Sequence, residues 1–341
     1  MPELTYREAL RNTLRDEMHR DENVVLMGEE IGVFEGSYKI TAGLLQEFGA
    51  RRVRDTPIAE EGFVGMAVGA AMLGLRPVVE IMTINFILLA LDQIVNHAAK
   101  IHYMFGGQAR VPLVIRTPGG GGQQLAATHS QNFEVWFAHT PGMKVVAPST
   151  PADARGLLKS AIRDDDPVLF LENLALYNTK GDVPADGPDE GLIPIGKAAI
   201  TRPGTDVTIV SYSRMAAVAL NVAEQLAAEG IDAEVVDLRS LRPLDRETVA
   251  ASVRKTNRAV VFEEDWRSYG VGAEVAASIQ ELAFDWLDAP VRRIGAAEVP
   301  LPYAKNMEIA ALPTAQHLVS AVRATLAASG GARGRGSLAR G

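Results

Sequence analysis

The sequence predicts an α/β protein built from two doubly wound domains, each a parallel sheet flanked by helices. Short apolar runs alternate with longer stretches of helical periodicity along almost the whole chain, as in parallel sheets joined by crossover helices. The 341 residues exceed one ordinary domain, and 31 glycines with few aromatic residues suit closely packed layers. A Gly-, Pro- and Asp-rich stretch divides the alternation, so we expect a domain at 1–177, a linker at 178–194, a domain at 195–329 and a disordered tail at 330–341.

The composition excludes several classes of function. A net charge of -8 argues against non-specific binding to nucleic acid, which depends on neutralising phosphates. The chain has no cysteine, so disulfides, thiolate chemistry and cysteine metal sites are excluded. No apolar run reaches membrane-spanning length, and the first residues form an amphipathic pattern rather than a signal peptide. We therefore expect a cytoplasmic protein that does not bind membranes.

The first predicted strand of the first domain leads to an acidic residue. A helix is expected to begin at Thr5, with Glu8 as its capping-box partner. A buried strand at 24–27 then leads to Glu29, and ligands in open α/β sheets gather beyond the carboxyl ends of strands. A solvated loop acid is the alternative for Glu29.

The segment 55–62 is the stretch around which the chain is organised. Pro57 cannot sit inside a helix, so Glu60 is expected at the start of the small-residue helix that follows. A carboxylate on a rigid element beside an apolar run suits general acid/base chemistry. On the local sequence alone, a structural charge that favours the helix N-terminus is the commoner explanation.

The next strands introduce an aromatic residue and a glycine run. A strand at 76–82 precedes Phe86 and a helix through 92–98, so Phe86 is expected at the same sheet edge, although a core aromatic is its commoner role. A strand at 111–116 leads to the glycines 119–122. This run lacks the lysine of a P-loop, and no strand is followed by a dinucleotide-binding glycine pattern. We expect a mobile loop.

That loop carries His129, which makes it a candidate for proton transfer near neutral pH. Hydrogen bonding within the loop is the alternative. Strands at 143–147 and 168–172 complete the first sheet, with a helix at 151–163 between them. At the end of this helix, the carbonyls of Ala161 and Ile162 with the acids Asp164 and Asp166 could bind a hard cation, although a solvated turn is the commoner outcome.

The second domain repeats the alternation of strands and helices. Strands are expected at 207–211, 233–238, 258–263 and 291–294, and helices at 215–229, 245–255, 271–284 and 314–327.

Many motifs in a fixed order resemble one known family along almost the whole chain, the linker and tail excepted. The chain is similar to the beta subunit of the two-chain, thiamin-diphosphate-dependent 2-oxoacid dehydrogenase component. The matching segments are 28–30, 55–60, 74–77, 92–96, 129–131, 156–163 and 301–305. The resemblance implies a pyrimidine-binding thiamin-diphosphate domain followed by a transketolase C-terminal-like domain.

The resemblance also implies a role for each candidate residue. Glu60 matches the carboxylate that hydrogen-bonds N1′ of the cofactor's aminopyrimidine, where proton exchange activates the thiazolium carbon. His129 matches the histidine that faces the substrate. The positions that line the aminopyrimidine pocket correspond to Glu29, Ile58, Met82 and Phe86. Those of a potassium site correspond to Leu113, Ala161, Ile162, Asp164 and Asp166, the first three through main-chain oxygens.

An absent motif implies a partner. Thiamin enzymes usually bind Mg²⁺ and the diphosphate through a Gly-Asp-Gly segment, which this sequence lacks. The resemblance therefore implies an alpha subunit that holds this half of the cofactor in an alpha2beta2 heterotetramer, and a lipoyl-bearing acyltransferase that receives the acyl group. The segment 82–86 resembles the members that act on pyruvate; branched-chain 2-oxo acids and acetoin are the alternatives. A transketolase-like enzyme should carry both cofactor halves, and a non-catalytic scaffold should lack Glu60 or His129.

Overall fold

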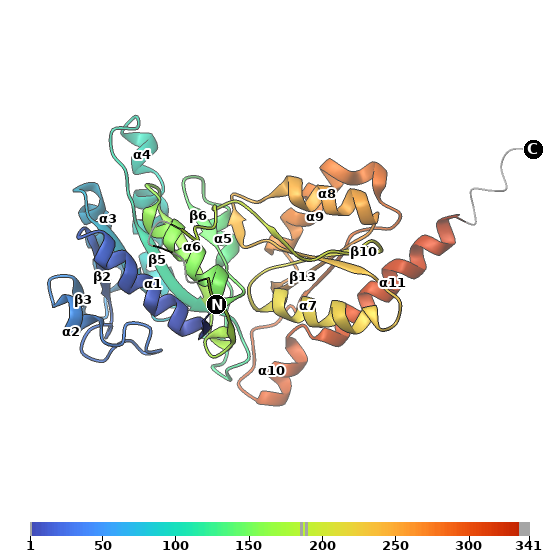
Figure 1. Ribbon diagram of the computed structural model, residues 1–341, viewed down its shortest axis with the longest axis horizontal. Helices are drawn as coiled ribbons and strands as arrows, with labels where there is room; N and C mark the ends of the chain where they lie inside the picture. Colours follow the sequence, from blue (N-terminus) through green and yellow to red (C-terminus); the bar gives the residue numbers. More distant parts are fainter. Residues whose placement is uncertain (1, 185–186, 188–189, 334–341) are drawn as a thin grey trace, which may run out of the picture. The chain divides into compact units, whose positions relative to one another are not determined.

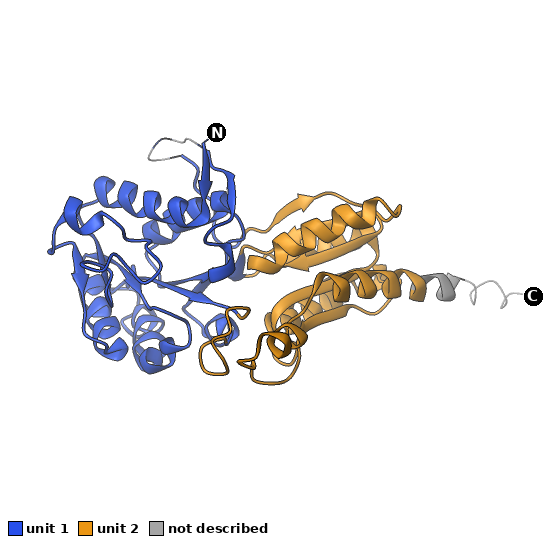
Figure 2. Cartoon of the chain, turned by 90° about the horizontal axis from the view of Figure 1, so that it is seen from below, with its two compact units in different colours: residues 1–120, 131–196, 240–243 blue, residues 121–130, 197–239, 244–341 orange. Residues whose placement is uncertain are grey.

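The computed structural model of the chain describes residues 2–184, 187 and 190–333. The chain forms two compact units, coloured separately in Figure 2. Unit 1 comprises residues 1–120, 131–196 and 240–243, and unit 2 comprises residues 121–130, 197–239 and 244–341. Each unit is therefore built from segments that are not contiguous in the sequence.

Unit 1 contains a seven-stranded sheet with the strand order β12-β6-β7-β5-β4-β2-β3. All neighbouring strands are parallel except β12, which pairs antiparallel with β6 at the edge. The strands β2, β4, β5 and β7 are almost fully buried, as expected for a parallel sheet covered on both faces. The bounds are β2 Val24–Gly28, β3 Val53–Asp55, β4 Arg76–Glu80, β5 Val114–Gly119, β6 Lys144–Val146, β7 Val168–Asn173 and β12 Ser240–Arg242.

The helices of unit 1 lie on both sides of this sheet (Figure 2). Helix α1 begins with the predicted capping box, in which Thr5 accepts from the Glu8 amide and Glu8 accepts from the Thr5 amide. Helices α1 and α6 lie side by side (Figure 1). The bounds are α1 Tyr6–Arg20, α2 Leu44–Phe48, α3 Glu60–Met72, η1 Phe86–Ala90, the π-helix η2 Asp92–Ala98, α4 Ile101–Met104, α5 Glu134–Ala138, α6 Pro151–Arg163 and η3 Leu174–Leu176.

Unit 2 contains a five-stranded sheet with the order β14-β13-β10-β11-β9. Helices α8 and α9 pack together on one face, and α7 and α11 on the other (Figure 1). The strands are β9 Ala199–Arg202, β10 Val207–Ser211, β11 Ala233–Asp237, β13 Ala259–Trp266 and β14 Arg292–Ala296. The helices are α7 Ser213–Ala227, α8 Arg246–Thr256, α9 Val271–Ala283, η4 Phe284–Trp286, α10 Lys305–Ala311 and α11 Ala315–Arg333.

The predicted fold class is confirmed, because both units are α/β structures whose central strands are parallel. The alternation did not reveal the short antiparallel strands β9 and β12, nor the two-stranded pair of β1 Glu3–Thr5 with β8 Lys180–Asp182. Strands of three or four residues are too short to show periodicity. The domain limits 1–177 and 195–329 stay a prediction.

The predicted tail differs from the structure at its start. Helix α11 continues through Arg333, so residues 330–333 are helical rather than disordered. Extending an existing helix adds one hydrogen bond for each residue that is ordered, whereas starting a new helix is costly. The rest of the predicted tail, 334–341, lies outside the described residues. Within the described ranges, no helix combines the length and the apolar character needed to cross a membrane.

Candidate active site

Three neighbouring strands of unit 1 end at the same level of the sheet. Strand β2 lies between β3 and β4, and Gly28 at its end is in register with Asp55 of β3 and Glu80 of β4. A β-carbon at Gly28 would lie 2.6 Å from the Glu80 carbonyl oxygen, so only glycine allows this close approach. The residues that follow these strands, among them Glu29, Glu60 and Met82, are thereby brought to one edge, as expected for a ligand site in a parallel sheet.

Glu60 is the first residue of helix α3, and its side chain is only 3% exposed. The preceding turn is fixed to the sheet, because the Thr56 N–H donates to the Gly28 carbonyl at 3.0 Å. Its carboxylate makes no hydrogen bond or ion pair with any residue in the described ranges. A buried acid at a helix N-terminus gains from the helix dipole. The absence of a protein partner leaves this carboxylate available for a ligand.

Glu29 follows β2 directly and is 6% exposed. Its Oε1 is buried and accepts no hydrogen bond from the residues that the structure describes. Burial raises the pKa of Glu29 to about 7, with further contributions from the negative charges of Glu60 and Glu30. A carboxyl group with this pKa exchanges protons near neutral pH, and its buried oxygen lacks the partner that such atoms normally have.

The loop after β2 is held by the neighbouring strand. Both oxygens of the Asp55 carboxylate accept main-chain hydrogen bonds, from Gly32 at 2.5 Å and from Val33 at 3.0 Å. Because Asp55 ends β3, this contact ties the Glu29 loop to the strand that leads to Glu60. The acidic pair therefore rests on a hydrogen-bonded frame.

The predicted apolar residues of the pocket belong to the same strand ends. Met82 follows β4, and Phe86 begins η1, where its N–H donates to the Thr83 carbonyl at 3.0 Å. Both side chains are partly buried. Ile58, in the turn before Glu60, is 84% exposed. A large apolar side chain this exposed is available to a ligand or a partner chain.

His129 lies in unit 2, whereas Glu29 and Glu60 lie in unit 1. Its side chain is exposed, and its Nδ1 is 3.0 Å from the Thr128 hydroxyl. The His129 N–H donates to the Ala126 carbonyl at 3.3 Å, closing a turn. The histidine is thus presented by a structured loop of unit 2.

The predicted cation site forms a turn rich in oxygen atoms, and protein cations already contact it. Lys144 Nζ is 2.7 Å from an Asp164 carboxylate oxygen and 3.1 Å from Asp166. Burial alone would lower the pKa of Lys144, but its bonds to these two acids raise it overall. Arg76 Nη1 donates to the Ile162 carbonyl at 3.0 Å. The carbonyls of Leu113 and Ala161 accept from Val168 and Asp164. A carbonyl oxygen has two lone pairs, so each of these acceptors retains capacity for an ion.

Sequence reasoning missed a buried charge network beside the site. The Arg116 guanidinium of β5, 2% exposed, bonds Glu80 of β4 at 2.8 Å and Glu172 of β7 at 2.7 Å. Tyr177 donates to Glu172 at 2.6 Å. Burial raises the pKa of Glu172, and burial together with the Glu172 charge raises that of Tyr177. Charged residues near the ends of otherwise apolar strands are the signal that could have revealed this network.

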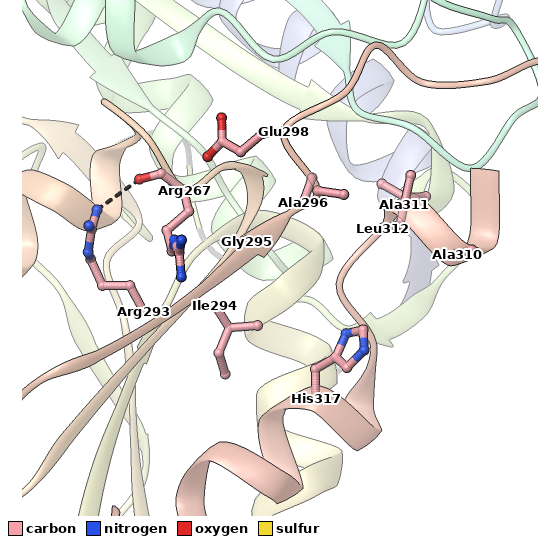
Figure 3. A pocket seen from close by; sticks show the side chains of 11 residues that line it. Arg267, Arg293, Ile294, Gly295, Ala296, Glu298, Ala310, Ala311, Leu312 and His317 are labelled. Carbon is pink, nitrogen blue, oxygen red and sulfur yellow. Dashed lines mark hydrogen bonds between the residues drawn. The ribbon is translucent and has the colours of Figure 1, made fainter. Parts of the chain in front are cut away.

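Unit 2 also contains a pocket of about 360 Å³, shown in Figure 3. Its polar lining residues are Arg267, Arg293, Glu298 and His317, and the others are apolar residues that range in size from glycine to leucine. In the same view, Arg293 donates to the Arg267 carbonyl at 2.8 Å. None of the predicted site residues lines this pocket, so it does not contribute to the assignment of the active site.

The chain matches known families over both halves. Residues 2–180 match the family described as transketolase, pyrimidine binding domain, and residues 196–318 match the transketolase C-terminal domain. A solved structure titled split gene transketolase, inactive beta4 tetramer, covers 96% of this chain and 99% of its own, with a TM-score of 0.77 and 27% identity.

Relatives with higher sequence identity are named as beta subunits of the pyruvate dehydrogenase E1 component. The pyruvate dehydrogenase E1 component subunit beta-2, mitochondrial, of Oryza sativa subsp. japonica is 54% identical, over 94% of this chain and 86% of the relative. The E1 component subunit beta of Rhizobium meliloti (strain 1021) is 52% identical, over 95% and 70%. That of Rickettsia felis (strain ATCC VR-1525 / URRWXCal2) is 51% identical, over 94% and 98%. With this identity over nearly its whole length, the chain belongs to the family of pyruvate dehydrogenase E1 component beta subunits.

Proposed function

We propose that this chain is the beta subunit of a pyruvate dehydrogenase. With an alpha subunit it catalyses the thiamin-diphosphate-dependent decarboxylation of pyruvate. The acetyl group and two electrons then pass to the lipoyl disulfide of an acyltransferase, which gives acetyl-CoA in the full complex. The observation that carries this proposal is the buried acidic pair Glu29 and Glu60, at the strand ends of a chain of this family.

The two acids suit the aminopyrimidine half of the cofactor. When bound, thiamin diphosphate supplies a carbon nucleophile that attacks the 2-oxo group and accepts the electrons released by decarboxylation. Glu60 would hydrogen-bond N1′ and exchange a proton there, since its carboxylate has no protein partner among the described residues. Glu29 has a buried oxygen without a partner in the described ranges, so it would bind a donor on the same ring.

The apolar residues would orient the ring. Phe86 and Met82 are partly buried at the adjoining strand end, where an aromatic face and a thioether can pack against a pyrimidine. Ile58 is exposed and would be covered when cofactor and partner are bound. His129 would face the substrate from the unit 2 loop.

The proposal requires an alpha subunit, in an alpha2beta2 heterotetramer. The sequence lacks a Gly-Asp-Gly segment, and the described residues contain no group of three acids or histidines that could hold a metal. Mg²⁺ and the diphosphate would therefore be held mainly by the alpha subunit. Exposed apolar side chains along α3, η1 and α4 support a partner there; they are Met66, Met72, Leu73, Leu89, Tyr103 and Met104.

Helix α3 contains two glycines, Gly65 and Gly69, with different surroundings. A β-carbon on Gly65 would lie 3.0 Å from Gln93 Oε1, so Gly65 serves packing inside unit 1. A β-carbon on Gly69 would meet nothing within 4 Å. Gly69 therefore leaves a surface on which a partner helix could approach closely.

We propose that a potassium ion binds the turn formed by Leu113, Ala161, Ile162, Asp164 and Asp166. The free lone pairs of the three carbonyls support it, although the contacts of Lys144 and Arg76 limit the space. Thermal unfolding in potassium chloride and in choline chloride at equal ionic strength tests this site. A higher unfolding temperature in potassium is expected, and an equal one would contradict the site.

The proposed function also includes a cellular location for the enzyme and a protein that accepts the acyl group. We place the enzyme in the cytoplasm of its cell, as expected from the sequence, although the rice relatives are named mitochondrial. The acyl acceptor is a lipoyl-bearing dihydrolipoyl acyltransferase core, as the membership of the family implies.

The test is the activity of the chain co-expressed with its alpha subunit. We expect lipoyl-dependent turnover with pyruvate to exceed that with branched-chain 2-oxo acids and acetoin. A faster turnover with branched-chain 2-oxo acids or with acetoin would assign the chain to that substrate instead of pyruvate. An assembly that forms, binds thiamin diphosphate and turns over none of the three would favour a non-catalytic scaffold.

A further inference from the structure

The loop that carries His129 is anchored to unit 2 by two acidic side chains. Residues 121–130, here called the His129 loop, belong to unit 2, whereas strand β5 before them and Gln131 after them belong to unit 1. A β-carbon on Gly121 would lie 2.5 Å from Leu301 Cδ1. Glycine is therefore required where the loop enters unit 2.

The first anchor is Glu264 of strand β13, a largely buried residue. The Gly121 N–H donates to Glu264 Oε1 at 2.7 Å. Arg214 of α7 contacts the other oxygen of the same carboxylate at 3.1 Å. Arg214 therefore balances the charge of Glu264, and Glu264 uses only one of its two oxygens to bind the loop.

The second anchor is Glu308 of helix α10, which is 1% exposed. The Gly122 N–H donates to Glu308 Oε1 at 2.9 Å, and the Gln124 N–H lies 3.2 Å and 3.1 Å from its two oxygens. No lysine, arginine or histidine forms an ion pair with Glu308 in the described ranges. A buried carboxylate requires hydrogen bonds, and main-chain amides of the loop supply those that Glu308 receives.

We propose that Glu308 is a positioning residue for His129. This inference rests on the proposed function, from which the role of His129 comes. The carboxylate holds the amides at 122 and 124, and the chain then turns through Ala126 to His129. Without the carboxylate these amides exchange their partner for water, and the imidazole loses its defined approach to the substrate.

Two measurements on the co-expressed alpha-beta assembly test the proposal. In Glu308→Ala, hydrogen exchange at the amides of Gly122 and Gln124 should accelerate by about tenfold or more, the factor expected from one hydrogen bond to a charged group. Glu308→Gln keeps an acceptor oxygen and should give an intermediate rate. Glu274→Ala, an exposed acid on α9 of the same unit, is the matched control and should change nothing. Unchanged exchange in Glu308→Ala would overturn the anchoring.

A double-mutant cycle separates positioning from general destabilisation. Glu308→Ala and His129→Ala should each slow pyruvate turnover, and the double variant should be no slower than His129→Ala, because both changes remove one function. Losses that multiply would contradict the positioning role. If His129→Ala alone leaves turnover unchanged, the proposed role of His129 is wrong, and so is the positioning role of Glu308. The hydrogen-exchange measurement still decides whether Glu308 anchors the loop. Glu308→Gln decides the matter if the alanine variant does not assemble.

Discussion

Glu29 and Glu60 show how two acids on neighbouring elements acquire different properties. Glu60 begins a helix, where aligned peptide dipoles favour a negative charge, and it lacks any protein partner in the described ranges. Glu29 is buried after a strand beside that charge, so its proton is retained to about pH 7. Glu29 therefore offers a carboxyl group that exchanges its proton near neutral pH.

Replacing Glu60 with Gln should cut turnover by roughly 10²–10⁴-fold, the range for a positioned acid/base group. An amide can still hold the aminopyrimidine but cannot exchange the proton at N1′. Steady-state turnover with pyruvate and calorimetric binding of thiamin diphosphate by the assembly measure the two effects. Near-normal turnover would contradict the proposed role of Glu60. So would a variant that assembles poorly but turns over normally for each bound cofactor.

Glu29 should make stability fall as the pH rises. Its pKa is raised from 4.5 to about 7 in the folded chain, so between these values the native state holds one more proton than the unfolded state. The stabilisation is complete below pH 4.5, declines between pH 4.5 and about pH 7, and is lost above it. Asp265, whose pKa burial raises to about 7, adds to the same trend.

Urea unfolding of Glu29→Gln from pH 5 to pH 8 isolates this contribution. Relative to the native chain, the variant should gain stability as the pH rises. Glu61→Gln, an exposed acid one residue after Glu60, is the control and should give a flat difference. A flat difference for Glu29→Gln as well would show that its proton is not linked to folding.

At the scale of elements, the parallel strands of unit 1 carry a buried network of charges. Arg116 bridges the acids of the strands on both sides of β5, and two carboxylates share one guanidinium in a buried setting. Removing any one of these side chains is destabilising, because the remaining charges stay buried without a partner. Its member Glu80 ends β4, which pairs with β2, the strand that leads to Glu29.

Replacing Arg116 with Met should therefore lower the free energy of unfolding by about 3–5 kcal/mol, the range for breaking a buried ion pair. Arg110, an exposed arginine paired with Asp165, is the matched control. Arg110→Met should cost about 1 kcal/mol or less. Equal effects in urea unfolding would show that burial adds nothing to the Arg116 network.

At the scale of the whole molecule, the proposed function divides the cofactor site between this chain and an alpha subunit. Unit 1 holds the acidic pair and unit 2 the His129 loop, but no diphosphate or metal motif is present in the sequence. Its apolar side chains along α3, η1 and α4 remain exposed.

The isolated chain should accordingly bind thiamin diphosphate weakly, and the assembly with its alpha subunit tightly. Isothermal titration calorimetry of both preparations, with Mg²⁺ present, measures the difference. The pyrimidine alone contributes few contacts, whereas the diphosphate and metal carry most of the charge-based affinity. Tight binding by the isolated chain would contradict the half-site.

Residue patterns were enough to predict two α/β units, several strand ends and the acids that follow them. Apolar alternation marked the strands β2, β4 and β10 to within a few residues, and the family motifs pointed to Glu60 and His129. These properties are local: side-chain periodicity and turn residues act within one element and its neighbours in the chain.

Which distant elements meet could be learned only from the folded chain. The order β3-β2-β4 places Gly28 beside Asp55 and Glu80, and the His129 loop joins unit 2 through Glu264 and Glu308. The Arg116 network likewise joins three strands. Periodicity states which face of an element is buried but not against what, because pairing depends on long-range packing and on hydrogen bonds between residues far apart in the chain.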